Sequence, residues 1–228
     1  MTQRAETLGK LADLVLSVER PHPVRVAIDG CSAAGKTTLA DELAEVLRDR
    51  TEREVIRVGI DYFKRAVELR TSYPVDSPEG YYLETWDNEA IRDRLLTPLG
   101  PRGDRRYTTG LMDPSAQIVL DRPAAVAAED AVLLVDGAFL QRPELDAHWD
   151  LRIYVDVTFD EVLRRGIARD QAWMPSAEAA EHRYRTKYIP GEKLYVAQVQ
   201  PQARAEILLD NQDPAEVRFV GGLGGLRL

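Results

Sequence analysis

The chain contains 228 residues, of which 44% are hydrophobic and 30% are charged, and this composition is typical of one globular domain with a substantial core. No stretch approaches the roughly 18 apolar residues of a membrane span, and the charged N-terminal residues Arg4, Glu6, Lys10 and Asp13 are not typical of a signal peptide. The formal charge of −8 argues against a general nucleic-acid binder, although it leaves room for a local basic pocket that holds a small anion. The single cysteine, Cys31, cannot form an internal disulfide, so we expect a protein of the reducing cytoplasm.

The order of apolar segments predicts an α/β fold. Hydrophobic residues at helical spacing predict a lead-in helix within residues 5–20, which Pro21 and Pro23 end. After it, short β-branched runs alternate with helical patterns, and this alternation indicates a parallel sheet with helices on both faces. The predicted strands are 24–28, 55–60, 131–135, 151–157 and 205–209, and the predicted helices are 36–48, 87–96, 160–170, 176–188 and 192–199.

Residues 61–123 interrupt this alternation, because they are rich in Gly, Pro, Asp and Tyr and carry few strand signals. An insertion after the second strand is a common place for a substrate site, and within it residues 105–108 and 117–120 are expected to pair as a small antiparallel hairpin. No linker separates this segment, so residues 1–228 are expected to form one domain. The Gly-rich residues 221–228 are expected to be a disordered or loosely packed tail.

A phosphate-binding loop follows the first predicted strand. The sequence fits G-x-x-x-x-G-K-[ST], between a strand and an amphipathic helix, as that motif requires. Backbone N–H groups of such a loop and the N-terminus of its helix bind phosphate oxygens, Lys36 adds a charge for the transferring group, and the Thr37 hydroxyl is a candidate Mg²⁺ ligand. The alternative is a glycine turn that only caps a helix. The predicted phosphate-binding residues are Gly30, Cys31, Ser32, Ala33, Ala34, Gly35, Lys36, Thr37 and Thr38.

Two acids end predicted strands and are therefore expected at the same edge of the sheet. Asp136 follows the apolar run 131–135 and is a candidate Mg²⁺ ligand, with a simple turn as the alternative. Asp61 ends the second predicted strand, where a carboxylate can accept a proton from an acceptor hydroxyl during phosphoryl transfer. Its alternative is an N-cap for the segment that follows.

A basic helix is predicted within residues 160–190. Arg165 and Arg169 lie one turn apart, hence on one face, where their guanidinium groups can stabilise charge on the transferring phosphoryl group. The alternative is a solvated basic face that pairs with Glu161 and Asp170.

Taken together, these motifs resemble the uridine kinase family of P-loop kinases over nearly the whole chain. The loop is similar to that family's G-x-S-x-S-G-K-T-T, and residues 60–63 resemble its D-x-F segment, in which the Asp is the base. The resemblance implies that Asp87, after Trp86, holds ribose hydroxyls and that Tyr107 packs against a pyrimidine. It also implies that residues 160–190 form a lid that closes over ATP. Residues 211–214 resemble an adenine-side loop. Together with the turn-rich aromatic segment 76–82, this predicts acceptor contacts from Phe63, Tyr82, Trp86, Asp87 and Tyr107, and further ATP contacts from Asn211 and Asp213.

The chain also departs from the family's pattern in the acceptor region. Asp136 stands for the family's Glu, Lys64 for an aromatic residue after D-x-F, and Met112 for the His that reads the pyrimidine. The predicted function is transfer of the γ-phosphoryl group of ATP, with Mg²⁺, to the 5′-hydroxyl of a nucleoside. The alternatives are the same chemistry on pantothenate, a sugar or another alcohol, including one that already carries negative charge, and a regulatory NTPase without an acceptor. The expected partners are ATP and a small-molecule acceptor, with no nucleic acid and no membrane, and a homo-oligomer is compatible with the sequence.

Overall fold

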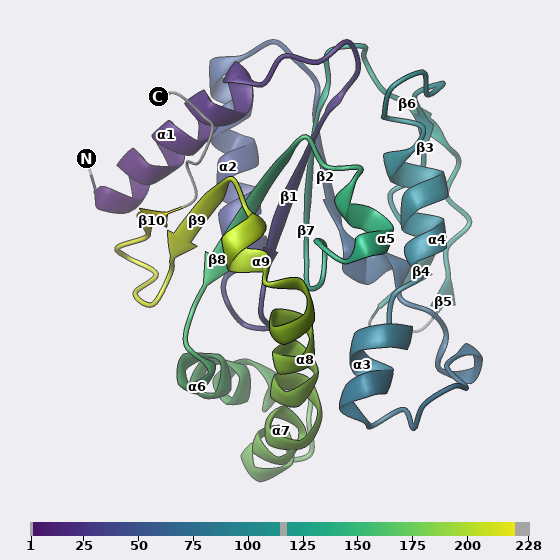
Figure 1. The fold of residues 1–228 in the computed structure, drawn as a ribbon, viewed down its shortest axis with the longest axis vertical. Coiled ribbons are helices and arrows are strands. Elements are labelled where there is room, and N and C mark those ends of the chain that lie inside the picture. Colours follow the sequence, from purple (N-terminus) through teal and green to yellow (C-terminus); the bar gives the residue numbers. More distant parts are fainter. Residues whose placement is uncertain (1, 115–117, 222–228) are drawn as a thin grey trace.

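A six-stranded sheet forms the centre of the protein in the computed structural model, which describes residues 2–114 and 118–221. The strand order is β10-β9-β8-β1-β7-β2 (Figure 1). All neighbouring strands are parallel except the edge strand β10, which runs antiparallel to β9. The bounds are β1 Val24–Gly30, β2 Val55–Gly59, β7 Val132–Gly137, β8 Leu151–Asp156, β9 Ile207–Asp210 and β10 Arg218–Gly221.

The central strands are apolar on both sides because helices cover both faces of the sheet. Every residue of β1 and of β7 is buried. Alternate residues point to opposite faces, so Val26 and Ile28 belong to one hydrophobic cluster and Ala27 to the other. The predicted parallel α/β sheet is therefore confirmed, with strand ends that differ from the expected ones by one or two residues.

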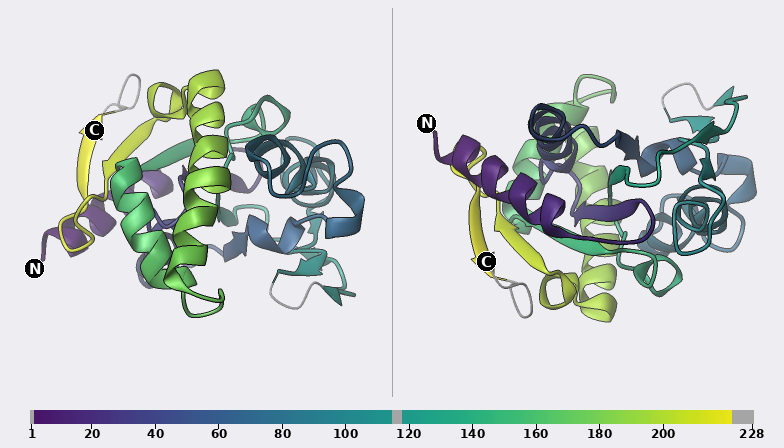
Figure 2. Two further views of the ribbon diagram at one scale, coloured as in Figure 1. Left: turned by 90° about the horizontal axis from the view of Figure 1, so that it is seen from below. Right: turned by 90° about the horizontal axis from the view of Figure 1, so that it is seen from above.

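The first hydrophobic cluster is covered by α1 (Gln3–Ser17) and α2 (Lys36–Arg50), which pack against each other. The second lies under α5 (Pro143–Asp146), α8 (Ile189–Val199) and the insertion. Figure 2 shows α1 and α8 on opposite sides of the sheet. The lead-in helix is confirmed but ends at Ser17, with Thr2 as its N-cap. No helix among the described residues is long and apolar enough to cross a membrane.

Helices at the carboxyl edge of the sheet are interrupted by wider turns. The predicted helix 87–96 is α4 (Asn88–Ile91) followed by the π-helical turn η3 (Arg92–Leu96). The predicted helix 176–188 is α7 (Ala177–Arg183) followed by the π-helical turn η4 (Tyr184–Tyr188), which continues directly into α8. The remaining helices are α3 (Pro78–Glu84), α6 (Phe159–Asp170), α9 (Pro201–Arg204) and the short 3₁₀ turns η1 (Ile60–Phe63) and η2 (Val67–Leu69).

The insertion contains a hairpin, but the predicted pairing of 105–108 with 117–120 was wrong. Instead β4 (Met112–Asp113) pairs with β5 (Ile118–Val119), and outside them β3 (Arg106–Tyr107) pairs with β6 (Ala125–Val126). The inner hairpin is held on η1, because the Leu111 N–H donates to the Tyr62 carbonyl over 2.8 Å. Gln117 and residues 222–228, most of the predicted Gly-rich tail, lie outside the described residues, whereas Gly221 is the last residue of β10.

Candidate active site

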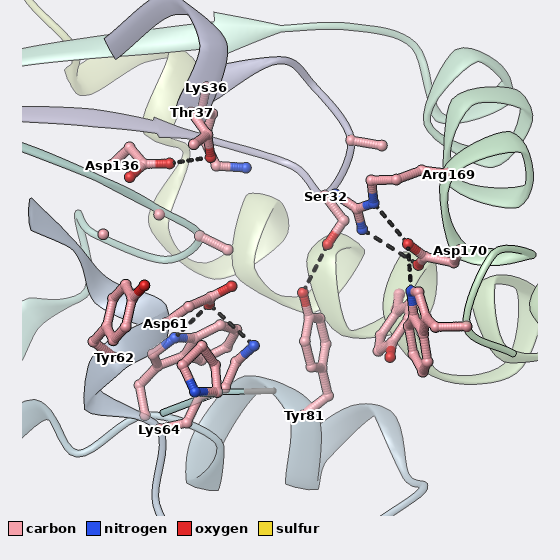
Figure 3. A pocket seen from close by; sticks show the side chains of 18 residues that line it. Ser32, Lys36, Thr37, Asp61, Tyr62, Lys64, Tyr81, Asp136, Arg169 and Asp170 are labelled. Carbon is pink, nitrogen blue, oxygen red and sulfur yellow. Dashed lines mark hydrogen bonds and ion pairs between the residues drawn. The ribbon is translucent and has the colours of Figure 1, made fainter. Parts of the chain in front are cut away.

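A cavity of about 780 Å³ opens at the carboxyl ends of β1, β2 and β7. This is the edge at which ligands bind in parallel α/β sheets. Its wall combines the phosphate loop, the start of the insertion and the turn after α6 (Figure 3). The lining residues are Ser32, Ala33, Lys36, Thr37, Gly59, Asp61, Tyr62, Lys64, Tyr81, Trp86, Pro114, Asp136, Gly137, Ala138, Arg169, Asp170, Trp173 and Tyr188.

The phosphate loop has the backbone geometry of an anion site. Ala33 and Gly35 have positive φ angles of 56° and 90°, and a side chain at Gly35 would meet the Asn211 amide, whose Nδ2 lies 2.6 Å from the position of its Cβ. Helix α2 then begins at Lys36 with no side-chain cap on its N-terminus, so its first N–H groups are free to bind a ligand. The Lys36 Nζ donates to the Cys31 carbonyl over 2.6 Å, which holds the ammonium within this loop.

Thr37 and Asp136 meet at the top of the cavity. The Thr37 hydroxyl donates to Asp136 Oδ2 over 2.5 Å, and Asp136 Oδ1 lies 2.8 Å from Arg57 Nη2. A hydroxyl and a carboxylate are oxygen ligands of the kind that Mg²⁺ prefers, and Mg²⁺ usually retains several waters and takes few protein ligands. The chemistry of this pair therefore fits the predicted magnesium role. No cluster of three or more His, Cys, Asp or Glu side chains suited to a metal occurs in residues 2–114 and 118–221.

Asp61 lies in η1, immediately after β2, and points into the cavity (Figure 3). Its side chain is 56% exposed, and Lys64 Nζ lies 3.1 Å from its Oδ1. The indole N–H of Trp86 donates to the same oxygen over 3.3 Å. A solvent-accessible carboxylate held by two donors can accept a proton from a bound hydroxyl.

Arg169 reaches the cavity from the end of α6. It donates to Asp170 over 2.6 Å and to the Tyr184 hydroxyl over 3.1 Å. Burial alone would lower the pKa of Arg169, but the hydrogen bond to Asp170 and nearby negative charges, including Asp61, raise this pKa above its ordinary value. The guanidinium is therefore a permanent positive charge beside Asp61 and the phosphate loop.

Arg165 does not line the cavity. Its Nη2 donates to the carbonyls of Asn211 and Gln212, each over 2.9 Å, and its Nε donates to Glu161 over 2.5 Å. Hydrogen bonds from Arg164 and Arg165 lower the pKa of Glu161 to about 2. Arg165 therefore supports the 211–214 loop. Of the two arginines, Arg169 is the one whose side chain lines the cavity.

The 211–214 loop lies against the phosphate loop. Asn211 Nδ2 donates to the Ala34 carbonyl over 2.6 Å. Asp213 stabilises its own turn, because its Oδ1 accepts from the Ala215 N–H over 2.9 Å.

The predicted acceptor residues are divided between the cavity and the core. All four aromatic residues among them belong to the second hydrophobic cluster. Trp86 also lines the cavity, whereas Phe63, Tyr82 and Tyr107 are absent from the lining. Asp87 is also outside the lining and caps α4 by accepting from the Ala90 N–H over 3.0 Å.

Two buried carboxylates behind the phosphate loop were not predicted from the sequence. Glu192 is fully buried on α8, and its Oε1 accepts from the Ser32 N–H over 2.6 Å. Asp29 is fully buried at the end of β1, where it accepts hydrogen bonds from the Gly30 N–H and the Tyr195 hydroxyl. Burial raises the pKa of both groups. Their signal in the sequence is an acid inside an otherwise apolar strand or helix pattern.

Comparison with known proteins finds kinases that are similar to this chain. No protein-family model matches the chain. Uridine-cytidine kinase B of Dictyostelium discoideum is 26% identical over 156 residues, which are 66% of this chain and 60% of that protein. The chain therefore spans less than two thirds of the length of this relative.

Solved structures share the whole fold. A possible uridine kinase from Bacillus stearothermophilus superposes with a TM-score of 0.70 at 20% identity, covering 90% of this chain and 97% of that one. A candidate fructose transport system kinase from Silicibacter sp. gives 0.69 at 26% identity, covering 86% and 95%.

A parallel sheet whose first strand leads into this phosphate loop, with Lys36 and Thr37 opening the next helix, defines a P-loop kinase fold. Within that class, the chain is similar to uridine kinase-like small-molecule kinases.

Proposed function

We propose that the protein transfers the γ-phosphoryl group of ATP to a hydroxyl group of a small molecule. The observation that carries the proposal is that Lys36 of the phosphate loop and Asp61 line one cavity. A cation for the transferring phosphoryl group and a carboxylate for the acceptor proton are thereby held on the two sides of a shared space. Phosphoryl transfer depends mainly on such positioning and on electrostatic stabilisation.

Five of the lining residues have a task in this reaction. The loop amides and Lys36 bind the phosphates, and Asp61 accepts the proton of the attacking hydroxyl. Arg169 stabilises negative charge that spreads over the phosphoryl oxygens. Thr37 and Asp136 would hold Mg²⁺, which when bound neutralises phosphate charge and orients the phosphate tail.

A nucleoside is the first candidate acceptor, with its 5′-hydroxyl on Asp61. It is supported by the sequence likeness to a uridine-cytidine kinase and by the D-x-F and Trp86-Asp87 motifs. The second candidate is a non-nucleoside alcohol. It is favoured by the absence of Asp87 and Tyr107, the expected ribose and base contacts, from the cavity lining.

The decisive experiment is an ATP-consumption screen against nucleosides, pantothenate and sugars, with the phosphorylated product identified by mass. The variant Asp61→Asn should lose transfer while binding ATP as the wild type does, because Asp61 lies apart from the phosphate loop. Asp49→Asn on the exposed end of α2 is the matched control and should keep full activity. A regulatory NTPase would instead hydrolyse ATP without any acceptor and would not depend on Asp61, and that outcome would overturn the proposal.

A further inference from the structure

Lys64 places a positive charge directly beside the proposed base. Its Nζ lies 3.1 Å from Asp61 Oδ1 and 5.8 Å from the centre of the Trp86 ring, within the range of a cation–π contact. The backbones of Lys64 and Trp86 also form a β-bridge. The ammonium is thus fixed at the acceptor end of the cavity, with its side chain only 25% exposed.

From this geometry we infer that the acceptor is an alcohol that also carries an acidic group, a carboxylate or a phosphate, and that Lys64 binds this group. The inference rests on the proposed phosphotransfer function and specifies its substrate class. The acidic group would lie within a few bonds of the reacting hydroxyl, because the base and the ammonium are only 3.1 Å apart.

The other lining cations have partners at the nucleotide end. Lys36 lies within the phosphate loop and contacts the Cys31 carbonyl, while Arg169 is bound to Asp170. Lys64, in contrast, is ion-paired with Asp61 itself. A lysine ammonium has three N–H donors, so a contact with one oxygen of Asp61 leaves donors for a ligand.

Charge balance explains why an acidic acceptor would need this lysine. The acceptor hydroxyl must approach both the Asp61 carboxylate and the negatively charged γ-phosphoryl group. An acidic group on the acceptor adds a third negative charge at close range, which is unfavourable in a partly buried site. The Lys64 ammonium offsets this repulsion, whereas a neutral acceptor does not require it.

The rest of the acceptor end is aromatic. Tyr62, Tyr81, Trp86 and Tyr188 line the cavity there, and Tyr81 packs against the rings of Trp86 and Tyr188 at centroid distances of 5.5 and 4.9 Å. Aromatic walls with a few polar groups are suited to a short hydrocarbon body whose orientation is set by one charged contact.

Lys64 takes no part in bond making under this proposal. The acceptor oxygen forms a bond to the γ-phosphorus, and the bond from that phosphorus to the bridging oxygen breaks. The electron pair of that bond leaves with ADP, and the hydroxyl proton passes to Asp61. Lys64 determines which acceptor is bound, so replacing Lys64 should raise the KM for the acceptor.

The test uses matched neutral and acidic alcohols: glycerol and glycerate, panthenol and pantothenate, ribose and ribose 5-phosphate, with uridine added. In the wild type, one of the acidic alcohols should give the highest kcat/KM. Comparing glycerate and pantothenate with ribose 5-phosphate shows whether the enzyme prefers a carboxylate or a phosphate. Lys64→Met should raise the KM for that acceptor by about 10- to 100-fold, the value of a charged hydrogen bond, and leave the KM for ATP within about twofold. Lys64→Arg, which keeps the charge, should retain part of the affinity.

Lys193→Met is the matched control. Lys193 also lies over an aromatic ring, that of Phe159 at 5.2 Å, but it does not line the cavity, so this variant should behave as the wild type. A neutral acceptor that is used as well as any acidic one, or an unchanged acceptor KM in Lys64→Met, would overturn the inference and leave the kinase proposal intact. If no acceptor is phosphorylated, the kinase proposal fails and the inference fails with it. The ranking of acceptors by the wild type and the Lys64→Arg data remain decisive even where Lys64→Met does not fold.

Discussion

Thr37 and Asp136 are joined by a hydrogen bond of 2.5 Å between Oγ1 and Oδ2, although 99 positions separate them in the chain. The contact arises because β1 and β7 are neighbours in the sheet, with Ile28 opposite Asp136. Arg57 of β2 holds the other carboxylate oxygen at 2.8 Å. Three elements therefore fix one carboxylate beside the start of α2, where the phosphate tail of a nucleotide would end.

The first prediction is that Asp136→Asn raises the Mg²⁺ requirement of the enzyme. An amide is a weaker Mg²⁺ ligand than a carboxylate, so the free Mg²⁺ concentration for half-maximal rate should increase about tenfold or more, as for a lost interaction of about 1.4 kcal/mol. The measurement is the initial rate against free Mg²⁺ at saturating ATP. Asp41→Asn is the control, since Asp41 is the exposed second partner of Arg57, and its Mg²⁺ curve should not move. Identical curves for Asp136→Asn and the wild type would remove Asp136 from metal binding.

The second prediction concerns Lys36. Lys36→Met should lower kcat by about 10²- to 10³-fold, the usual effect of losing one preorganised electrostatic contact to the transition state. Lys10→Met, on the exposed face of α1, should leave kcat unchanged. The rates are measured at saturating ATP and acceptor, and near-wild-type turnover in Lys36→Met would contradict the role of its ammonium.

The third prediction separates the two arginines of α6. Arg165→Ala removes the hydrogen bonds to the Asn211 and Gln212 carbonyls, so it should raise the KM for ATP and lower the free energy of unfolding by about 1–3 kcal/mol. Arg169→Ala should instead lower kcat about 100-fold. Steady-state kinetics on both variants, with chemical denaturation of each, provide the comparison. The same kinetic change in both would mean that the two arginines act as one unit.

The phosphate loop could be predicted from the sequence because its chemistry is local. Consecutive backbone N–H groups and the adjacent Lys36 and Thr37 carry it, so a pattern of eight residues contains nearly the whole site. The five parallel strands of the sheet were also predictable, since burial on both faces requires continuous β-branched and apolar runs. The exposed edge strand β10 has no such run and was not predicted. The location of Asp61 and Asp136 at the carboxyl edge of the sheet could be predicted because each residue ends a predicted strand.

Side chains whose partners are distant in the chain could not be placed in this way. Glu192 contacts Ser32 across 160 positions, and neither residue predicts the other. The predicted strand pairing within the insertion was wrong for a different reason. Its strands are two residues long, which is too short for an alternation pattern to define a pairing, so contacts with Tyr62 decide the register. Tyr82 and Tyr107 are aromatic residues that serve equally well in a core or in a binding wall, and packing places both in the core.

The fourth prediction is a pH dependence of stability that comes from Glu192. Burial raises the pKa of this carboxyl above the ordinary 4.5, so the folded state binds its proton more tightly than the unfolded state does. The stability that Glu192 contributes should therefore be fully present below pH 4.5 and should be lost as pH rises through the raised pKa.

Glu192→Gln removes this titration while its amide oxygen can still accept from the Ser32 N–H. Its free energy of unfolding should thus fall less than that of the wild type over the same range, as measured by urea denaturation from pH 4.5 to 8. Asp29, whose raised pKa acts in the same direction, is present in both proteins and cancels in the difference. Glu161, with a pKa of about 2, acts in the opposite direction and only below pH 4.5. Glu45→Gln on the exposed face of α2 is the control and should reproduce the wild-type dependence of the free energy of unfolding on pH. If Glu192→Gln and the wild type show the same dependence, the Glu192 carboxyl does not change protonation on unfolding.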